Sequence, residues 1–340
     1  MFRGKSSPLF WWRDPGFLSR LLIPSAKLYS YFAARNMRTR IPLEIDLPVL
    51  CIGNFTLGGS GKTPVVISFA QTAGKLGYKP GILSRGFGGS FLDGAHVVDI
   101  NKDSACFVGD EALLLAEYGT VVVSHNRYIG ARLLKKIGCD LILMDDGFQS
   151  RRLYPDYALL VVDGMRGFGN GKVFPSGPLR APLITQFCYT DSILVIDCGK
   201  KLPEIPGIPV FYAILVPLAN GEVENKRFLS FTGIGNPKKF FRSVKVLGGM
   251  IEQERIFPDH HFFREFEVKD IAENARLNDL HIATTAKDYM RLRVNGLYRF
   301  LDKLIVFDIH VDFKSSNFCE KILEEVISRY KGRMRDGDLA

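Results

Sequence analysis

The apolar residues along the chain follow two regular patterns. Short, nearly continuous apolar runs, typical of strands buried in a parallel sheet, lie near 80–84, 96–100, 120–123 and 157–162. Between them, residues near 109–118 and 126–138 carry apolar side chains at helical spacing. This strand–helix alternation predicts an α/β core with a doubly wound parallel sheet, which we place at residues 43–205.

The alternation resumes in the last third of the chain, after an interval rich in proline. Within 206–228 we expect a linker hairpin, in which residues 210–217 pair with 228–231 around Asn220-Gly221. Residues 229–340 are expected to form a second, smaller α/β domain, whose last helix could pack back on the core. Its elements are predicted as helices near 237–244, 268–278 and 316–330 and strands near 280–284 and 304–309.

The first 40 residues differ in charge from the rest of the chain. They hold eight Lys or Arg against one Asp, whereas the whole chain has 45 Lys or Arg, 36 Asp or Glu and a net charge of +9. Aromatic and leucine side chains, among them Trp12, Phe17 and Phe32, lie between these cations. Because interfacial helices have this composition, we expect residues 1–42 to be a basic, amphipathic, membrane-associating helix region. The alternative is an amphipathic helix packed on its own domain.

Composition excludes several other classes. A chain with 46% hydrophobic residues is not disordered, and basic charge concentrated in one segment argues against nucleic acid as a partner. Charges and Pro24 interrupt the apolar runs near the N-terminus, so we expect no membrane-spanning segment there. The six cysteines form no C-x-x-C pair, and we therefore expect reduced thiols and no zinc site.

A glycine-rich motif follows a short apolar strand at 48–53 and precedes a helical stretch. The motif consists of Thr56, Leu57, Gly58, Gly59, Ser60, Gly61, Lys62 and Thr63. Strand, glycine loop, Lys-Thr and helix are the context of a P-loop, whose backbone amides surround phosphate oxygens. We expect these residues to bind ATP, with Lys62 at the β- and γ-phosphates and the Thr63 hydroxyl on Mg²⁺. Thr56 stands where the usual pattern has glycine.

A later apolar strand ends in two carboxylates, Asp145 and Asp146. An acid at the carboxyl end of a parallel strand is typical of a Walker-B element, in which one carboxylate holds Mg²⁺ directly or through water. We therefore predict that Asp145 and Asp146 form the metal site together with Thr63.

Three further clusters are candidates for chemistry. Asp110-Glu111 opens a predicted helix, where acids also serve simply as caps. His260-His261, beside Asp259, could supply an acid/base group, metal ligands or only a hydrogen-bonded loop. The glycine- and proline-rich segment 163–180 carries Arg166 and Arg180, which suit phosphate recognition.

Together these motifs resemble the tetraacyldisaccharide 4′-kinases, the lipid A 4′-kinases of Gram-negative bacteria. The resemblance runs in order from about residue 10 to 290. The segments that carry it are the P-loop motif through Pro64, Gly109-Asp110-Glu111, Asp145-Asp146-Gly147-Phe148-Gln149, Arg166-Gly167-Phe168-Gly169-Asn170-Gly171, Gly177-Pro178-Leu179-Arg180, Phe231-Thr232-Gly233-Ile234-Gly235-Asn236-Pro237, Phe257-Pro258-Asp259-His260-His261 and Thr284-Thr285-Ala286-Lys287-Asp288.

The resemblance implies ATP- and Mg²⁺-dependent phosphorylation of the 4′-hydroxyl of a tetraacyldisaccharide 1-phosphate, a lipid A precursor. It implies a peripheral enzyme at the cytoplasmic face of the bacterial inner membrane, and we infer no obligate protein partner. By position, Asp110 is similar to the family's catalytic aspartate and His260 to its partner histidine, beside Lys62 at the phosphates. Ala181 departs from the family, which usually has Glu there.

Two alternatives stay open from the sequence. One is a P-loop kinase that acts on another lipid or small hydroxyl compound. The other is a membrane-associated nucleotide switch, although Asn101-Lys102-Asp103 lacks the spacing of the guanine-specific N-K-x-D element.

Overall fold

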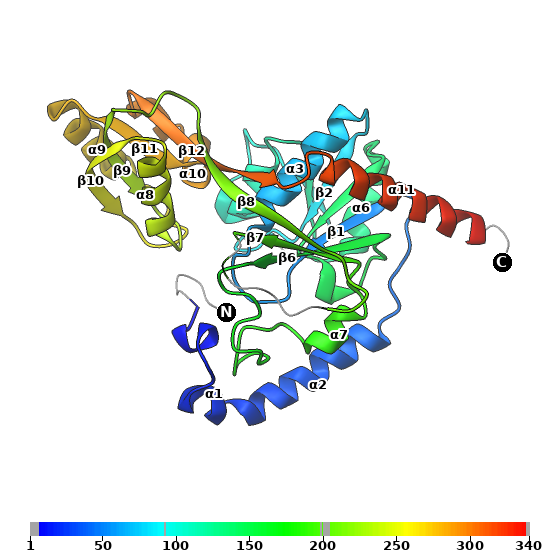
Figure 1. The fold of residues 1–340 in the computed structure, drawn as a ribbon. Coiled ribbons are helices and arrows are strands. Elements are labelled where there is room, and N and C mark those ends of the chain that lie inside the picture. The colour runs from blue at the N-terminus through cyan, green and yellow to red at the C-terminus, as the bar shows by residue number, and fades with distance from the viewer. Residues whose placement is uncertain (1–6, 92, 198, 200–204, 338–340) are drawn as a thin grey trace.

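The structure, a computed structural model, describes residues 7–91, 93–197, 199 and 205–337. Figure 1 shows a larger α/β core, a smaller α/β lobe beside it, and the N-terminal helices along one side of the core. The strands within the described residues are β1 (Val49–Gly53), β2 (Pro80–Ser84), β3 (His96–Val97), β4 (Thr120–Val123), β5 (Leu141–Asp145), β6 (Tyr157–Asp163), β7 (Ser192–Ile196), β8 (Val210–Ala219), β9 (Arg227–Thr232), β10 (Met250–Ile256), β11 (His281–Thr285) and β12 (Leu304–Phe313).

These strands form one continuous sheet in the order β10-β9-β11-β12-β8-β7-β6-β1-β5-β2-β4-β3. Neighbouring strands are parallel except for β3 with β4 and β12 with β8. The predicted fold class, a doubly wound parallel α/β sheet with a smaller α/β part, is therefore confirmed. The long strands β8 and β12 join the core to the lobe (Figure 1).

Helices cover both faces of the sheet. They are η1 (Leu9–Trp12), α1 (Phe17–Leu21), α2 (Ile23–Thr39), α3 (Lys62–Lys75), α4 (Ala105–Val108), α5 (Asp110–Leu115), α6 (Arg127–Lys136), η2 (Phe148–Ser150), α7 (Leu183–Phe187), α8 (Pro237–Val246), α9 (Glu265–Leu277), α10 (Ala286–Val294), η3 (Leu297–Phe300) and α11 (Phe318–Gly337). In the core, α3, α5 and α11 pack on one face, whereas α2, α6 and α7 pack on the other.

The continuous apolar runs are explained by this two-sided covering. In β5, Leu141 and Leu143 belong to the hydrophobic cluster on one face, and Ile142 and Met144 belong to the cluster on the other. Successive side chains of a strand point to opposite faces, so a strand covered on both sides has no polar alternation. The same arrangement brings the carboxyl ends of β1 and β5 together, with Ile52 paired to Asp145.

The predicted hairpin between 210–217 and 228–231 is wrong. The strand β8 pairs with β7 and β12, whereas β9 pairs with β10 and β11. The expected strand at 96–100 is shortened to β3, which pairs antiparallel to β4. Elements that were not predicted include β7, the edge strand β10, which carries three charged and exposed side chains, and the helices α4, α7 and α10.

The N-terminal helices α1 and α2 lie at the periphery, where α2 contacts α7 and η2 (Figure 1). Residues 1–6 of the expected membrane-associating region lie outside the described residues. Across the part of the chain that the structure describes, every helix is too short or too polar to cross a bilayer. Cys51, Cys106, Cys139, Cys188 and Cys319 are free thiols, and Cys198 lies outside the described residues.

Candidate active site

The glycine-rich loop connects β1 to α3, as its sequence predicts. Gly58 and Gly61 have φ of 105° and 82°, a region that favours glycine. A Cβ on Gly61 would also lie 3.0 Å from Cδ1 of Ile196. No side chain among the described residues caps the start of α3, so its first amides remain available to an anion.

A second segment of the chain braces this loop. The Leu57 amide donates to the Pro178 carbonyl at 2.8 Å, and Thr56 pairs with Leu179 as an isolated antiparallel bridge. The Nε atom of Arg180 donates to the Thr56 carbonyl at 3.0 Å. Thr56 is therefore extended and paired at the position where the usual motif has glycine.

The two aspartates at the end of β5 lie beside the start of α3. Lys62 Nζ is 3.6 Å from Oδ1 of Asp146, and Nη2 of Arg180 donates to Oδ2 of Asp146 at 3.0 Å. Asp146 has a positive φ of 52°, and its amide donates to the Ile52 carbonyl of β1. The structure thus brings Lys62, Asp146 and Arg180 into one cluster at the carboxyl edge of the sheet.

A carboxylate and an imidazole meet between the core and the lobe. Asp110 begins α5, and Nδ1 of His260, from the loop after β10, lies 2.5 Å from Oδ2 of Asp110. The Asp110 side chain is 5% exposed and that of His260 is 40% exposed. His260 has a left-handed φ of 60°, and the preceding Gly109 has φ of 91°, with Phe87 O 2.6 Å from where a Cβ would stand.

Comparisons with known proteins show which family the chain resembles over most of its length. A family model described as "Tetraacyldisaccharide-1-P 4'-kinase" matches residues 18–328. The chain belongs to the tetraacyldisaccharide 4′-kinase family. It is 54% identical to the "Tetraacyldisaccharide 4'-kinase" of Bartonella quintana over 334 residues, which cover 96% of this chain and 97% of that protein. It is 46% identical to the protein of the same name from Mesorhizobium japonicum, over 96% of this chain and 98% of that one.

The fold also matches a crystal structure from this family. The LpxK protein of Aquifex aeolicus, solved in complex with ATP, superposes with a TM-score of 0.72 at 24% identity, over 92% of this chain and 99% of that chain. At 24% identity this match supports the fold of the chain and not the role of any residue.

Burial and neighbouring charges shift the pKa values of the two aspartates in this 4′-kinase family member in opposite directions. Burial, together with the charges of Asp146 and Glu111, raises the pKa of Asp145 to about 6 against the lowering effects of Lys62 and Arg127. Burial also raises the pKa of Asp146, but Arg180 and Lys62 outweigh it and hold that pKa well below its usual range. The charge of Glu111, next to Asp110, thus acts on Asp145, which places the two clusters within electrostatic reach.

These aspartates fit a divalent cation. Oδ1 of Asp145 and Oδ1 of Asp146 are buried and accept no hydrogen bond from the described residues. Asp146 Oδ1 has the Lys62 ammonium 3.6 Å away. A buried carboxylate oxygen needs a positive partner, and oxygen ligands are those that Mg²⁺ prefers. No cluster of three or more His, Cys, Asp or Glu within the described ranges could hold a metal on its own. A hydroxyl, phosphate oxygens and water would have to complete the site.

The charges around the Asp110–His260 pair favour its ionised form. Burial raises the pKa of Asp110, but hydrogen bonds from His260 and Arg291 outweigh it and hold that pKa well below its usual range. The hydrogen bond to Asp110 raises the pKa of His260 above its ordinary value, against the effect of burial. The pair therefore rests as a carboxylate hydrogen-bonded to a basic imidazole.

The other singled-out residues have structural partners. His261 stacks on Phe257, with ring centroids 4.7 Å apart, and its Nε2 lies 3.0 Å from Oε2 of Glu267. The Arg166 guanidinium lies over the ring of Trp12, 4.8 Å from its centroid. Ala181 is fully buried in a hydrophobic cluster, against which Leu183 and Phe187 of α7 pack.

Two buried arginines near the site were missed from the sequence. Arg127 donates through Nη2 to the carbonyls of Asp145 and Asp146, at 2.9 and 3.2 Å. Arg291 contacts Asp110 from α10. The helix α10 has a readable start, because the Thr285 hydroxyl caps the Asp288 amide three residues later. Recognising that cap would have placed Arg291 on a helix.

Proposed function

We propose that this chain transfers the γ-phosphate of ATP to the 4′-hydroxyl of a tetraacyldisaccharide 1-phosphate, a lipid A precursor. The observation that carries the proposal is the 2.5 Å contact between Asp110 and His260, because Asp110 begins α5, which contacts the P-loop helix α3. Phosphoryl transfer needs a positioned nucleotide and an acceptor for the proton of the attacking hydroxyl. This chain has residues suited to both tasks.

We assign nucleotide binding to the P-loop residues from Thr56 to Thr63. The amides at the start of α3 and the Lys62 ammonium would surround the β- and γ-phosphates. Thr63, Asp145 and Asp146 would hold Mg²⁺, which supplies charge neutralisation at the transferred group when it is bound. Support comes from Oδ1 of Asp145 and Oδ1 of Asp146, which are buried and accept no hydrogen bond from the described residues.

We assign proton transfer to Asp110 and His260. A sugar hydroxyl has a pKa far above 7, so its proton leaves late, as the oxygen attacks the phosphoryl group. The Asp110 carboxylate would accept that proton, and the His260 imidazole would orient the carboxylate and share its charge. Helix capping, the alternative role for Asp110, is not supported, since its oxygens receive hydrogen bonds from His260 and Arg291.

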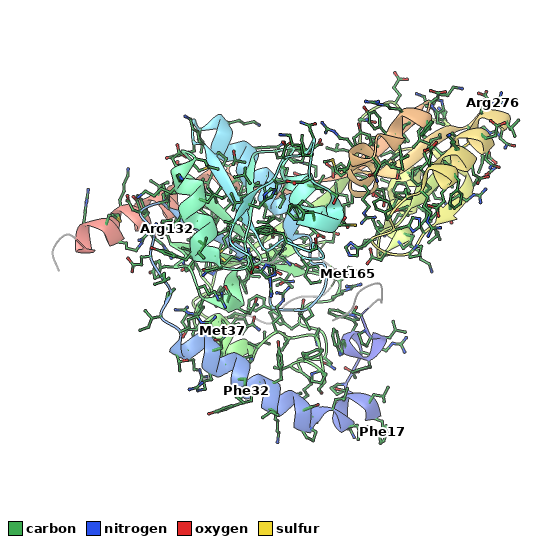
Figure 2. The ribbon with its side chains drawn as sticks, turned by 180° about the vertical axis from the view of Figure 1, so that it is seen from behind. Phe17, Phe32, Met37, Arg132, Met165 and Arg276 are labelled. Carbon is green, nitrogen blue, oxygen red and sulfur yellow. The ribbon has the colours of Figure 1, made fainter. Side chains whose placement is uncertain are left out.

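We propose that residues 1–42 bring the enzyme to the bilayer in which its acylated substrate resides, at the cytoplasmic face of the inner membrane. Phe17, Leu21 and Phe32 are 79%, 64% and 57% exposed. Figure 2 shows Phe17 and Phe32 at the outer edge of the N-terminal helices. Exposed aromatic side chains among cations suit a membrane interface better than packing within the domain.

Hydrogen bonds connect the N-terminal helices, which form this proposed membrane surface, to the segment 170–180 beside the P-loop. The Ser19 hydroxyl donates to the Ser176 carbonyl at 2.8 Å, and the Asn170 amide donates to the Trp11 carbonyl at 2.8 Å. Residues 171–180 then continue to Arg180, which contacts Thr56 and Asp146. Docking at the bilayer would thus fix the height of the active site above it.

The test is transfer of γ-labelled phosphate from ATP to a tetraacyldisaccharide 1-phosphate in mixed micelles. We expect a labelled lipid that carries the new phosphate at the 4′ position. Labelling of another lipid in its place would favour a kinase of different substrate class. Preference for GTP with no lipid labelled would favour a nucleotide switch.

A further inference from the structure

The Arg291 guanidinium is buried in the site region and donates four hydrogen bonds there. Its side chain is 4% exposed and comes from α10 in the smaller lobe. Nε donates to Oδ1 of Asp110 at 3.1 Å, and Nη2 donates to Oδ2 of the same carboxylate. This two-pronged contact fixes the plane of the Asp110 carboxylate as well as its position.

The same guanidinium also reaches the backbone that carries His260. Nη1 of Arg291 donates to the Gly233 carbonyl at 2.8 Å. That carbonyl accepts a second hydrogen bond from the His260 amide, at 3.0 Å. Because His260 has a left-handed φ of 60°, its conformation depends on such contacts. One side chain therefore restrains both Asp110 and His260.

Asp288 holds Arg291 in turn. The Asp288 side chain is fully buried, and its Oδ1 accepts from Nη1 of Arg291 at 2.7 Å. Its Oδ2 accepts from the hydroxyls of Thr232 and Thr285, at 2.6 and 2.7 Å. A buried ion pair contributes little net stability after desolvation, so stability alone does not explain the burial of Arg291 and Asp288.

We propose that Arg291 is a positioning residue, which holds the Asp110 carboxylate and the His260 backbone in the one arrangement that lets them act together. This inference rests on the proposed function. It assigns Arg291 no contact with substrate. Its effect is exerted through Asp110 directly and through Gly233 on His260.

The alternative is that Arg291 only stabilises the packing of the smaller lobe against the core. Two other ion pairs join α10 to the core: Lys287 Nζ lies 2.7 Å from Oε1 of Glu111 on α5, and Arg293 pairs with Glu117, just after α5. Arg293 is a matched control, since it lies two residues from Arg291 on α10, contacts the same segment of the core, and has no contact with Asp110. If Arg291 only stabilised that packing, the Arg291 and Arg293 variants would have similar kcat values and pH profiles.

Charged groups from every neighbouring element act on Asp110. They are Glu111 on its own helix, Lys287 and Arg291 on α10, and His260 on the loop after β10, whereas the charges of Asp288 and Asp259 act on Arg291. Of these cations, Arg291 and His260 donate to the carboxylate itself. Removing Arg291 takes away a direct positive partner, and such a loss raises the pKa of a carboxyl by about one to three units.

The experiment compares Arg291→Gln, Arg291→Lys and Arg293→Gln in the full chain. In kinase assays across pH, we expect Arg291→Gln to lower kcat about 10²-fold, with the KM for ATP little changed. In the pH profile of kcat for Arg291→Gln, the acidic limb should move to higher pH by about one unit or more. Arg291→Lys should recover part of both effects, because it keeps the charge without the two-pronged contact. Arg293→Gln should retain the wild-type profile.

A second measurement does not depend on activity. Proton NMR of the wild type should contain a low-field resonance from the hydrogen bond between His260 and Asp110, identified by its loss in His260→Gln. We expect this resonance to vanish in Arg291→Gln and to persist in Arg293→Gln. If Arg291→Gln fails to fold, Asp288→Asn, which loosens Arg291 without removing it, should weaken the same resonance.

The results separate the two proposals. A wild type that labels no acylated disaccharide overturns the proposed function, and the NMR comparison still tests the positioning role. An Arg291→Gln variant with the wild-type resonance and pH profile overturns the positioning role, as does an Arg293→Gln variant that changes both equally.

Discussion

Nδ1 of His260 lies 2.5 Å from Oδ2 of Asp110, although 150 positions separate them in the sequence. Asp110 belongs to the core and His260 to the smaller lobe, so the contact exists only when the two parts pack together. Of the pair, His260 is much the more exposed, with 40% of its side chain accessible. The solvent-accessible side of the pair is therefore that of the imidazole.

Replacing Asp110 with Asn tests its proposed role as proton acceptor. The amide keeps the size of the carboxylate but accepts no proton, so kcat should fall at least about 10²-fold. ATP affinity, measured by isothermal titration, should change little because the P-loop is intact. Glu117→Gln is the control, since Glu117 pairs with α10 away from His260. An equal loss of ATP binding and turnover would mean that Asp110 maintains the nucleotide site instead.

The His260–Asp110 contact also predicts how stability depends on pH. The pKa of His260 is raised by Asp110, so the pair stabilises the fold fully below the unfolded pKa of about 6.5. That contribution is lost as pH rises through the higher folded pKa. The difference in Tm between wild type and His260→Gln should therefore shrink from pH 6 to pH 8.5. A difference that stays constant or grows would contradict the assigned charge states.

Glycine at 109 is expected to be required for both folding and activity. Its φ of 91° disfavours other residues, and a Cβ would stand 2.6 Å from the Phe87 carbonyl oxygen. Gly109→Ala should cost at least about 2 kcal/mol and displace the adjacent Asp110. Gly74→Ala is the control, because Gly74 is in α3 with nothing near its Cβ position. That change should be neutral or stabilise the helix by up to about 1 kcal/mol. Chemical denaturation of the two variants measures both values.

The core was readable from the sequence because its signals are local. The strands β1, β2, β4, β5 and β6 are continuous apolar runs, and the glycines of the P-loop occupy positions that the backbone requires. The lobe was less readable. Its edge strand β10 carries Glu252, Glu254 and Arg255, so it lacks the apolar pattern of a buried strand. The pairing of β8 with β12 joins segments far apart in the chain, which no local turn signal reveals.

The site shows the same division between local and distant signals. Lys62, Thr63, Asp145 and Asp146 follow from motifs within single strand–loop units, and Asp110 and His260 were named through the resemblance to a family. Arg291 was missed because its importance comes from tertiary contacts with Asp110 and Gly233, while its contact with Asp288 lies within α10. A lone arginine in a helix is most often solvent-exposed, and nothing in its neighbours along the chain indicates otherwise.

The exposed aromatic residues of the N-terminal helices predict reversible binding to lipid surfaces. Phe17 and Phe32 are 79% and 57% exposed, and cations such as Arg20 and Arg35 lie on the same helices. Replacing both Phe residues with Ser removes apolar area that would enter the bilayer, at about 1.5–3 kcal/mol for each fully buried side chain. Co-sedimentation with vesicles containing anionic phospholipid should therefore decrease about tenfold or more.

The matched control for this variant replaces two comparably exposed residues of the smaller lobe, Val246 and Leu277, which are 62% and 68% exposed. They lie outside the basic N-terminal segment, so vesicle binding should be unchanged. In the kinase assay, the Phe17 and Phe32 variant should have a higher KM for the acylated disaccharide and an unchanged KM for ATP, because it is delivered poorly to the surface that holds the lipid. Equal loss of vesicle binding in both double variants would mean that general surface hydrophobicity, and not the N-terminal helices, brings the protein to the bilayer.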